Sequence, residues 1–223
     1  MDLNRFLLID KPAGITSFGV VARIRRQLTE QAKQANWPGK RLKVGHCGTL
    51  DPFATGLLIV LTGKKTRKAE KYSKLDKVYE ATIKLGELST TGDPEGDIKP
   101  YDREVLAPTE TEVNRVLTSF VGEIVQTPPI YSAIKINGRR AYQLARRGEK
   151  PDIPPRKVTI YDIEQIFYSY PVLKIRTHVS SGTYIRTLAE DIGKKLGTGA
   201  YTTELRRTKI GEYDVRDAVK LAQ

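Results

Sequence analysis

One short loop in the N-terminal half of the chain carries the residues best suited to chemistry, namely Gly45-His46-Cys47-Gly48-Thr49-Leu50-Asp51-Pro52-Phe53-Ala54-Thr55-Gly56. Its single carboxylate, Asp51, could act as a nucleophile or as a general base. Proline restricts the residue before it to an extended backbone, so Pro52 directs the Asp51 side chain away from the local backbone. The glycines allow the loop to turn tightly around its contents.

Asp51 also has a structural interpretation, as the N-cap of a helix that has proline at its first position. Ala54-Thr55-Gly56 would end such a helix within one turn, so there is little helix to cap. On the residues alone, the catalytic and structural roles are equally supported. An apolar run over residues 57–61 follows the loop and predicts a strand behind it.

A predicted late helix could supply a cationic partner for this carboxylate. Its apolar face is formed by Ile185, Leu188, Ala189, Ile192 and Leu196, and Gly197 ends it. Arg186 lies about 100° around the helix from Ile185, off the apolar face. An arginine facing Asp51 would keep that carboxylate ionised, as a nucleophile requires. The alternative is that Arg186 is an exposed helix residue.

Three further side chains could contact a substrate or simply pack. Tyr79 begins a predicted strand, where tyrosine usually packs in the core, although it could stack on an unstacked base. His46 could contact RNA or fill the gap left by an extruded base. His178, inside a strand, is expected to be structural, and Tyr184 lies beside the N-terminus of the late helix.

The charge balance favours a polyanionic partner. The 223 residues include 38 Lys and Arg against 26 Asp and Glu, a formal net charge of +12, which favours nucleic acid or, alternatively, only solubility. A single cysteine excludes an internal disulfide and fits a reducing cytoplasm. With only two histidines, a structural zinc site is not expected. We find no signal peptide and no apolar run long enough to span a membrane.

The rest of the chain divides into short strands and amphipathic helices. Strands are predicted over 5–10, 78–86, 157–168 and 172–179, and helices begin near Thr16, Gly63, Thr109 and Ala141. Thr16 or Ser17 can cap the first helix, which has Val20, Val21, Ile24 and Leu28 on one face. Several strands are hairpin-linked and few form βαβ units, so the predicted fold class is α+β with a mostly antiparallel sheet. Residues 29–43 predict a flexible connection. The acidic turn 90–97 is not a calcium loop, because Ile98 occupies the position that needs glycine.

Taken together, these segments resemble the tRNA pseudouridine synthase B family, which makes pseudouridine 55 in the tRNA T loop. The loop 45–56 with Leu57-Leu58 is similar to the family signature. Further similar segments follow in the family's order: Asp10-Lys11-Pro12-Ala13-Gly14-Ile15-Thr16-Ser17, Lys77-Val78-Tyr79-Glu80-Ala81, Pro128-Pro129-Ile130-Tyr131-Ser132-Ala133-Ile134-Lys135, Ser181-Gly182-Thr183-Tyr184-Ile185-Arg186-Thr187-Leu188-Ala189 and Leu205-Arg206-Arg207-Thr208. The resemblance runs from about residue 5 to the end of the chain.

The resemblance implies a role for each of these side chains. Asp51 would be the nucleophile, Arg186 its ion-pair partner, and Tyr79 the aromatic stacked on the target uracil and a candidate base. The side chains that would line the pocket or contact flipped nucleotides are His46, Tyr184 and Leu205. Those that would lie near the RNA backbone are Lys11 and Lys64.

The resemblance also implies the fold and the activity. We expect one catalytic domain over residues 1–223, with a cleft across a mostly antiparallel central sheet flanked by helices. Family members usually continue into a small RNA-binding PUA domain, which is not expected here. The activity would be isomerisation of uridine to pseudouridine in the tRNA T arm after base flipping, by a cytoplasmic monomer without metal, organic cofactor or membrane. Assistance with tRNA folding is a further expectation.

The sequence has two alternative interpretations of function. A non-catalytic RNA-binding module would share the same cleft, whereas a metal-dependent RNA hydrolase is disfavoured because no carboxylate or histidine cluster has ligand spacing. Three basic segments are predicted to hold phosphates and set the docking position: Lys64 to Lys77, Arg139 to Arg147 and Arg206-Arg207.

Overall fold

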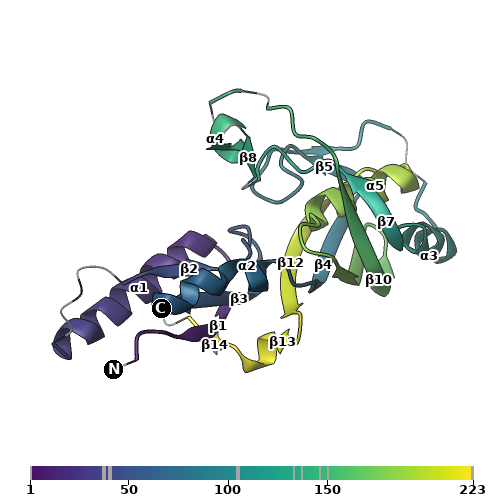
Figure 1. Cartoon of the computed structure of the whole chain (residues 1–223). Helices are drawn as coiled ribbons and strands as arrows, with labels where there is room; N and C mark the ends of the chain where they lie inside the picture. Colours follow the sequence, from purple (N-terminus) through teal and green to yellow (C-terminus); the bar gives the residue numbers. More distant parts are fainter. Residues whose placement is uncertain are drawn as a thin grey trace. The chain divides into compact units, whose positions relative to one another are not determined.

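The computed structural model describes residues 2–36, 39, 42–103, 106–132, 134–136, 138–145, 147–149 and 151–221. The chain separates into two compact units, Met1–Lys77 with Arg206–Gln223 and Val78–Leu205. One strand, β12 (Ala200–Ile210), contributes residues 206–210 to the first unit and residues 200–205 to the second. The prediction of a single domain stays a prediction, and we describe each unit by itself (Figure 1).

In the first unit, β3 is the central strand of a mixed sheet. β3 (Thr55–Thr62) pairs antiparallel with β1 (Phe6–Lys11) and parallel with β12 through Arg206 and Arg207. β14 (Val219–Lys220) extends the sheet beyond β1, β2 (Val44–His46) pairs with β3, and β13 (Tyr213–Asp214) pairs with β12. Nearly every residue of β3 is buried, so this strand has core on both faces.

Helix α1 (Ser17–Gln34) covers one face of this sheet. The Thr16 hydroxyl caps it by accepting from Gly19 N at 2.9 Å, as predicted. Its buried residues Val20, Ile24 and Leu28 join a core with Ile9, Leu42, Leu58 and Val60. The flexible connection predicted from residue 29 is wrong for residues 29–34, which extend the helix because Ala32 continues its buried face. Trp37, Pro38, Lys40 and Arg41 of that segment lie outside the described residues.

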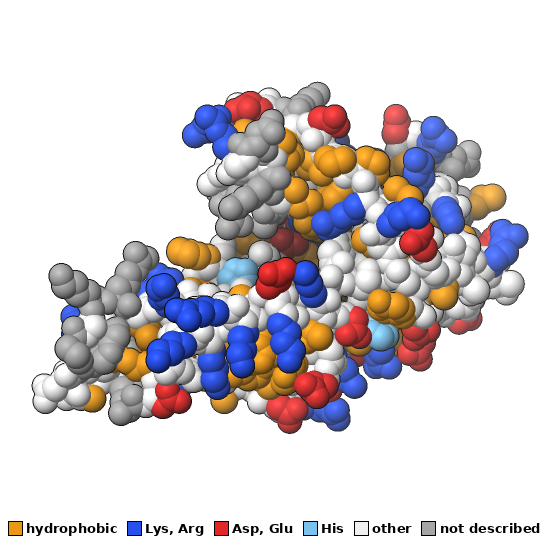
Figure 2. Space-filling view, viewed as in Figure 1, with side chains coloured by type: hydrophobic (Ala, Val, Ile, Leu, Met, Phe, Trp, Pro, Cys, Tyr) orange, Lys and Arg blue, Asp and Glu red, His pale blue; other side chains and the backbone are white. Residues whose placement is uncertain are grey.

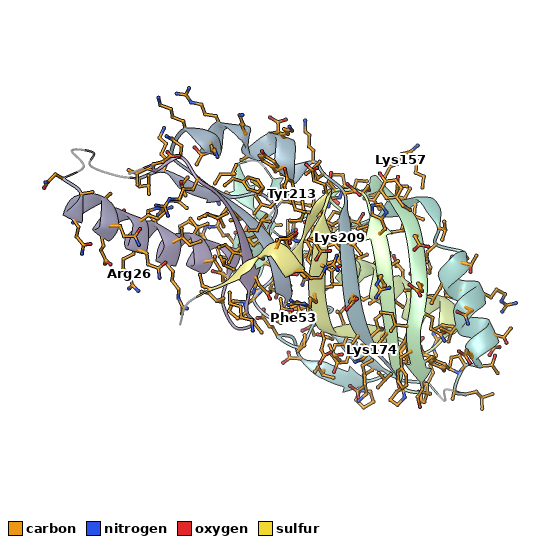
Figure 3. All side chains as sticks on the ribbon, turned by 90° about the horizontal axis from the view of Figure 1, so that it is seen from below. Arg26, Phe53, Lys157, Lys174, Lys209 and Tyr213 are labelled. Atoms are coloured by element: carbon orange, nitrogen blue, oxygen red, sulfur yellow. The ribbon has the colours of Figure 1, made fainter. Side chains whose placement is uncertain are left out.

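A basic helical stretch covers the other face. η1 (Gly63–Lys68) and α2 (Ala69–Ser73) follow β3, as the sequence predicted. Beneath them Leu57, Ile59 and Leu61 pack with Cys47 and Ile210. Phe6, Tyr72 and Tyr213 form an aromatic cluster against this core, with ring centroids 5.0–6.1 Å apart; Figure 3 shows Tyr213.

The second unit has a sheet in the order β12-β4-β11-β10-β7. β4 (Lys77–Leu85) alternates between buried and half-buried residues, as its pattern predicted. β10 (Arg156–Ser169) and β11 (Val172–Val179) form the predicted antiparallel hairpin, and β7 (Gly122–Gln126) pairs antiparallel with β10.

Helices α3 (Glu110–Thr118) and α5 (Ile185–Leu196) pack against each other in the second unit. Thr109 and Glu112 form a capping box at the start of α3. Gly197, with a φ of 71°, ends α5 as predicted. The small elements of the unit are β5 (Glu87–Ser89), β6 (Ile98–Pro100), β8 (Lys135–Ile136), β9 (Arg139–Arg140) and α4 (Ala141–Ala145). Asn137 and Arg146 lie outside the described residues.

These units confirm the predicted fold class, α+β with a mostly antiparallel sheet flanked by helices. Parallel pairing occurs in the described ranges between β1 and β14 and between β3 and β12. Within the same ranges, no helix is both long and apolar enough to cross a lipid bilayer.

Candidate active site

The loop that carries Asp51 connects β2 to β3. Because these strands pair antiparallel, with His46 opposite Val60, the loop is anchored at both ends. Cys47 N donates to Ile59 O at 2.9 Å and extends this anchor by one residue. The Asp51 carbonyl accepts from Ala54 N at 3.2 Å in a turn, and no helix begins there. The helix-cap interpretation of Asp51 is therefore wrong.

The first residue of α1 holds the backbone next to Asp51. The Ser17 hydroxyl donates to Leu50 O at 2.9 Å and accepts from Leu50 N at 2.8 Å. Ser17 and Leu50 are both buried, so a small side chain supplies both partners that this peptide would otherwise lack. The start of α1 thus fixes the residue immediately before the candidate nucleophile.

Arg207 holds the loop from the β12 side. Its guanidinium is 1% exposed and donates to Leu57 O at 2.8 Å, Gly48 O at 3.1 Å and Thr49 O at 3.4 Å. The prediction that Arg206-Arg207 holds phosphates is wrong for Arg207, because a buried guanidinium on loop carbonyls is not open to RNA. Arg206 is 39% exposed and pairs with Asp10 at 2.9 Å.

Lys11 holds the loop from the β1 side. Its ammonium is fully buried and donates to Pro12 O at 2.8 Å, Ile15 O at 2.8 Å and Pro52 O at 3.2 Å. Pro52 directly follows Asp51, so Lys11 positions the backbone after the carboxylate. Its predicted contact with the RNA backbone stays a prediction, and it would require the ammonium to leave these carbonyls.

In the second unit, Arg186 lies in the first turn of α5 and is buried. Its Nη1 pairs with Asp93 Oδ2 at 2.7 Å, and each side chain is 3% exposed. Nη1 also donates to Thr91 O and Nη2 to Tyr131 O, both at 2.8 Å. The alternative of an exposed helix arginine is therefore wrong. The predicted ion pair with Asp51 would join two units that we describe separately, and it stays a prediction.

Asp93 is the functional candidate that sequence reasoning missed. Its acidic turn suggests a calcium loop in the sequence, although an aspartate among Thr, Gly and Pro is also a suitable anchor for a buried arginine. Thr91 Oγ1 donates to Asp93 Oδ1 at 2.5 Å, and Glu95 N donates to the same oxygen at 3.0 Å. The carboxylate is thus fixed before it meets Arg186. No described group of three or more His, Cys, Asp and Glu side chains could hold a metal ion.

Glu190 lies one helical turn after Arg186, close to the same ion pair. Burial raises the pKa of its carboxyl from 4.5 to about 7, against the opposing effect of the Arg186 charge. The negative charges of Asp191 and Asp93 raise this pKa further. Glu190 therefore changes between its protonated and ionised forms near neutral pH, beside the buried arginine.

The other predicted residues lie on several different elements. Tyr79 on β4 and Leu205 on β12 are buried, at 8% and 6% exposure, while His46 on β2 is half-buried. Tyr184 precedes α5 and is held by Gln126, whose side-chain amide accepts from Tyr184 N at 3.1 Å and donates to Tyr184 O at 3.3 Å. His178 packs on Tyr161 with centroids 4.8 Å apart, which agrees with a structural role. Lys64 in η1 is exposed.

Two models of known families match this chain. Residues 34–185 match the TruB family pseudouridylate synthase (N terminal domain), and residues 186–223 match the tRNA pseudouridylate synthase B C-terminal domain. The chain belongs to the TruB family. The resemblance inferred from the sequence is therefore confirmed.

Relatives within the family cover nearly the whole chain. A protein named tRNA pseudouridine synthase B from Endomicrobium trichonymphae is 43% identical over 219 residues, which are 98% of this chain and 90% of the relative. One of the same name from Aquifex aeolicus (strain VF5) is 45% identical over 220 residues, 97% of this chain and 72% of the relative.

Solved structures share the fold of this TruB family member. The crystal structure of a Cbf5-Nop10-Gar1 complex matches with a TM-score of 0.69 and 32% identity, over 97% of this chain and 52% of that chain. The structure of an H/ACA RNP bound to a substrate RNA containing 2′-deoxyuridine matches with a TM-score of 0.67 and 29% identity, over 96% of this chain and 50% of that chain. This chain thus spans about half the length of these solved chains.

Proposed function

We propose that this protein isomerises uridine to pseudouridine at position 55 in the T loop of tRNA, with Asp51 as the nucleophile. The observation that carries the proposal is the Asp51 loop, braced on three sides, in a chain whose relatives are named tRNA pseudouridine synthase B. A carboxylate in an irregular loop is useful to chemistry only if its backbone is fixed. Lys11, Ser17 and Arg207 fix it here.

The exposed cations of η1 and α2 provide a docking surface for the RNA backbone. Figure 2 shows Lys and Arg side chains gathered on the first unit, and the exposed basic residues of this stretch are Lys64, Lys65, Arg67, Lys68, Lys71 and Lys74. Such contacts set the position of an RNA without reading its sequence. Specificity for the T loop then falls to groups that meet the extruded bases, for which we propose His46, Tyr184 and Leu205.

The target uridine leaves the stack before reaction, because its N1–C1′ bond and its C5 atom are not accessible inside a helix. Asp51 assists cleavage of the N1–C1′ bond, the uracil turns, and C5 bonds to C1′. The C5 proton then leaves, with Tyr79 as the candidate base, while N1 gains a proton, so that the product is an isomer of the substrate. Arg186, held by Asp93, keeps the Asp51 carboxylate ionised.

Tritium release tests this reaction directly. Unmodified tRNA labelled at uracil C5 is incubated with the protein in EDTA, and we expect label release from wild type. Asp51→Asn should bind the tRNA and release no label. Release by that variant would overturn the nucleophile assignment, and loss of wild-type release in EDTA would indicate a metal-dependent reaction instead.

The position of the product and the state of the enzyme need their own measurements. Replacing uridine 55 by cytidine should abolish product formation, and mass spectrometry of nuclease fragments should locate pseudouridine in the T arm of the unchanged tRNA. We propose a monomer, which light scattering of the free protein should show. A cytoplasmic location fits the single cysteine of the chain.

A further inference from the structure

Side chains from two neighbouring strands contact Tyr184. Gln126 at the end of β7 and Arg156 at the start of β10 are directly opposite each other in the antiparallel pair. Because cross-strand partners place their side chains side by side on one face, both reach the same target. That target is Tyr184, the residue that precedes α5.

Gln126 forms hydrogen bonds with the backbone of Tyr184. Its buried amide, 1% exposed, makes both a donated and an accepted hydrogen bond with the peptide groups of that residue. Tyr184 has an extended backbone, with φ −100° and ψ 113°, and its side chain does not cap the helix. The first turn of α5 holds Tyr184 through one bond, from Leu188 N to Tyr184 O at 3.0 Å, and the glutamine adds two more to the same residue.

Arg156 contacts the ring of Tyr184 and the turn before it. Its guanidinium carbon lies 4.9 Å from the centroid of the Tyr184 ring, within the range of a cation–π contact. Its Nη2 donates to Gly182 O, while Ser180 of the same turn is bonded to Thr159 of β10. The guanidinium thus limits the directions in which the ring can turn.

From this geometry we propose that Gln126 and Arg156 are positioning residues for the isomerisation, acting by fixing Tyr184 where the substrate base binds. The inference rests on the proposed function. It assigns to the β7–β10 pair the task of setting the Tyr184 ring and the start of α5, two residues before Arg186. As positioning residues they would act through Tyr184, so their loss should slow the reaction and leave tRNA affinity intact.

Single-turnover kinetics with enzyme in excess over C5-tritiated tRNA test the proposal. We expect Gln126→Met and Arg156→Met each to lower the rate constant about tenfold, as loss of one or two ordering contacts implies. The Kd for tRNA should stay within about twofold, since phosphate contacts dominate affinity. Because both residues act on Tyr184, the double variant should lose less than the product of the two single effects.

Two neighbours serve as matched controls. Lys157 follows Arg156 on β10, is exposed, and pairs with Glu123 at 2.8 Å; Figure 3 shows it at the edge of the molecule. Val125 precedes Gln126 on β7 and is 64% exposed. Lys157→Met and Val125→Met should keep the wild-type rate constant.

The outcomes are distinct. If the wild-type protein is active and both test variants keep its rate constant, the inference is overturned and the proposed function is not. The same holds if the loss of rate in the double variant equals the product of the two single losses. Rate losses matched by equal losses of tRNA affinity or of folded protein would show a merely structural role and overturn it too. An inactive wild-type protein would overturn the proposed function and the inference with it.

Discussion

Replacing Gly56 by alanine tests whether the Asp51 loop depends on the contact between β3 and β12. Gly56 has a φ of +102°, where an L side chain is strained by about 1–3 kcal/mol. A Cβ at this position would lie 2.3 Å from Arg207 O and 2.8 Å from Arg207 N. Both are backbone atoms, so no side chain can move away, and β3 and β12 would have to separate locally.

The size of this effect follows from those distances. Ordinary contact begins at 3.4 Å, so the backbone must move by about 1 Å, and such overpacking costs about 1–3 kcal/mol. Together with the strain at positive φ, we expect a loss of about 2–6 kcal/mol in the free energy of unfolding. For a chain of this length, that corresponds to a fall in Tm of about 4–24 °C.

Thermal melting and urea unfolding of Gly56→Ala measure this loss. The control is Gly45→Ala in the same loop region, since Gly45 has no positive φ and its added Cβ would meet no atom within 4 Å. That variant should melt within about 2 °C of wild type. A Gly56→Ala protein that also melted within that margin would refute the close approach of Gly56 to Arg207.

Three other substitutions test the remaining contacts and charges of the candidate site. Asp93→Asn should lower stability by about 3 kcal/mol, because it removes the Asp93 negative charge from beside the buried Arg186 guanidinium, and should slow single-turnover tritium release; full stability in urea would contradict the buried pair. Ser17→Ala should cost about 1–3 kcal/mol in the same titration, since Leu50 N and O lose their partner, whereas Ser73→Ala should cost little. Because the pKa of Glu190 is raised in the folded protein, its contribution to the free energy of unfolding is full below about pH 4.5 and is lost as pH rises through about 7. This loss of stability, up to about 3 kcal/mol, should be absent in Glu190→Gln. Parallel stability–pH curves for wild type and the variant would contradict it.

Periodic segments were predictable from sequence because their cause is local. The spacing of Val20, Ile24 and Leu28 marked the buried face of α1, and Thr16 marked its start. The same helix shows the limit of the approach. Residues 29–34 are polar except for Ala32, and only packing of that small side chain shows that the helix continues there.

The site was predictable as a set of residues but not as a set of contacts. Asp51 and Arg186 were found from loop chemistry and family motifs, whereas Asp93 was not, because its pairing with Arg186 joins positions 93 residues apart. Basic residues were the hardest to assign. Lys64 and Arg207 look equivalent in the sequence, yet Lys64 is exposed, whereas Arg207 is buried at 1% exposure and donates to backbone carbonyls. The pattern of charges along the sequence does not indicate which of the two is buried.

The sheet register explains why two buried cations hold this loop. On β3, Gly56 is paired with Lys11 of β1 on one side and with Arg207 of β12 on the other. The strands thus deliver one cation to each side of the point where the loop enters the sheet. An irregular loop leaves carbonyls without strand partners, and their burial is costly unless donors are supplied. The Lys11 ammonium donates to one loop carbonyl, Pro52 O, and to two carbonyls of the turn after β1. The Arg207 guanidinium donates to two loop carbonyls and to Leu57 O of β3, and glycine at position 56 lets the β12 backbone come close enough for it to do so. The same basic side chains that would suit RNA binding on the surface are therefore required inside this unit to build the loop that presents Asp51.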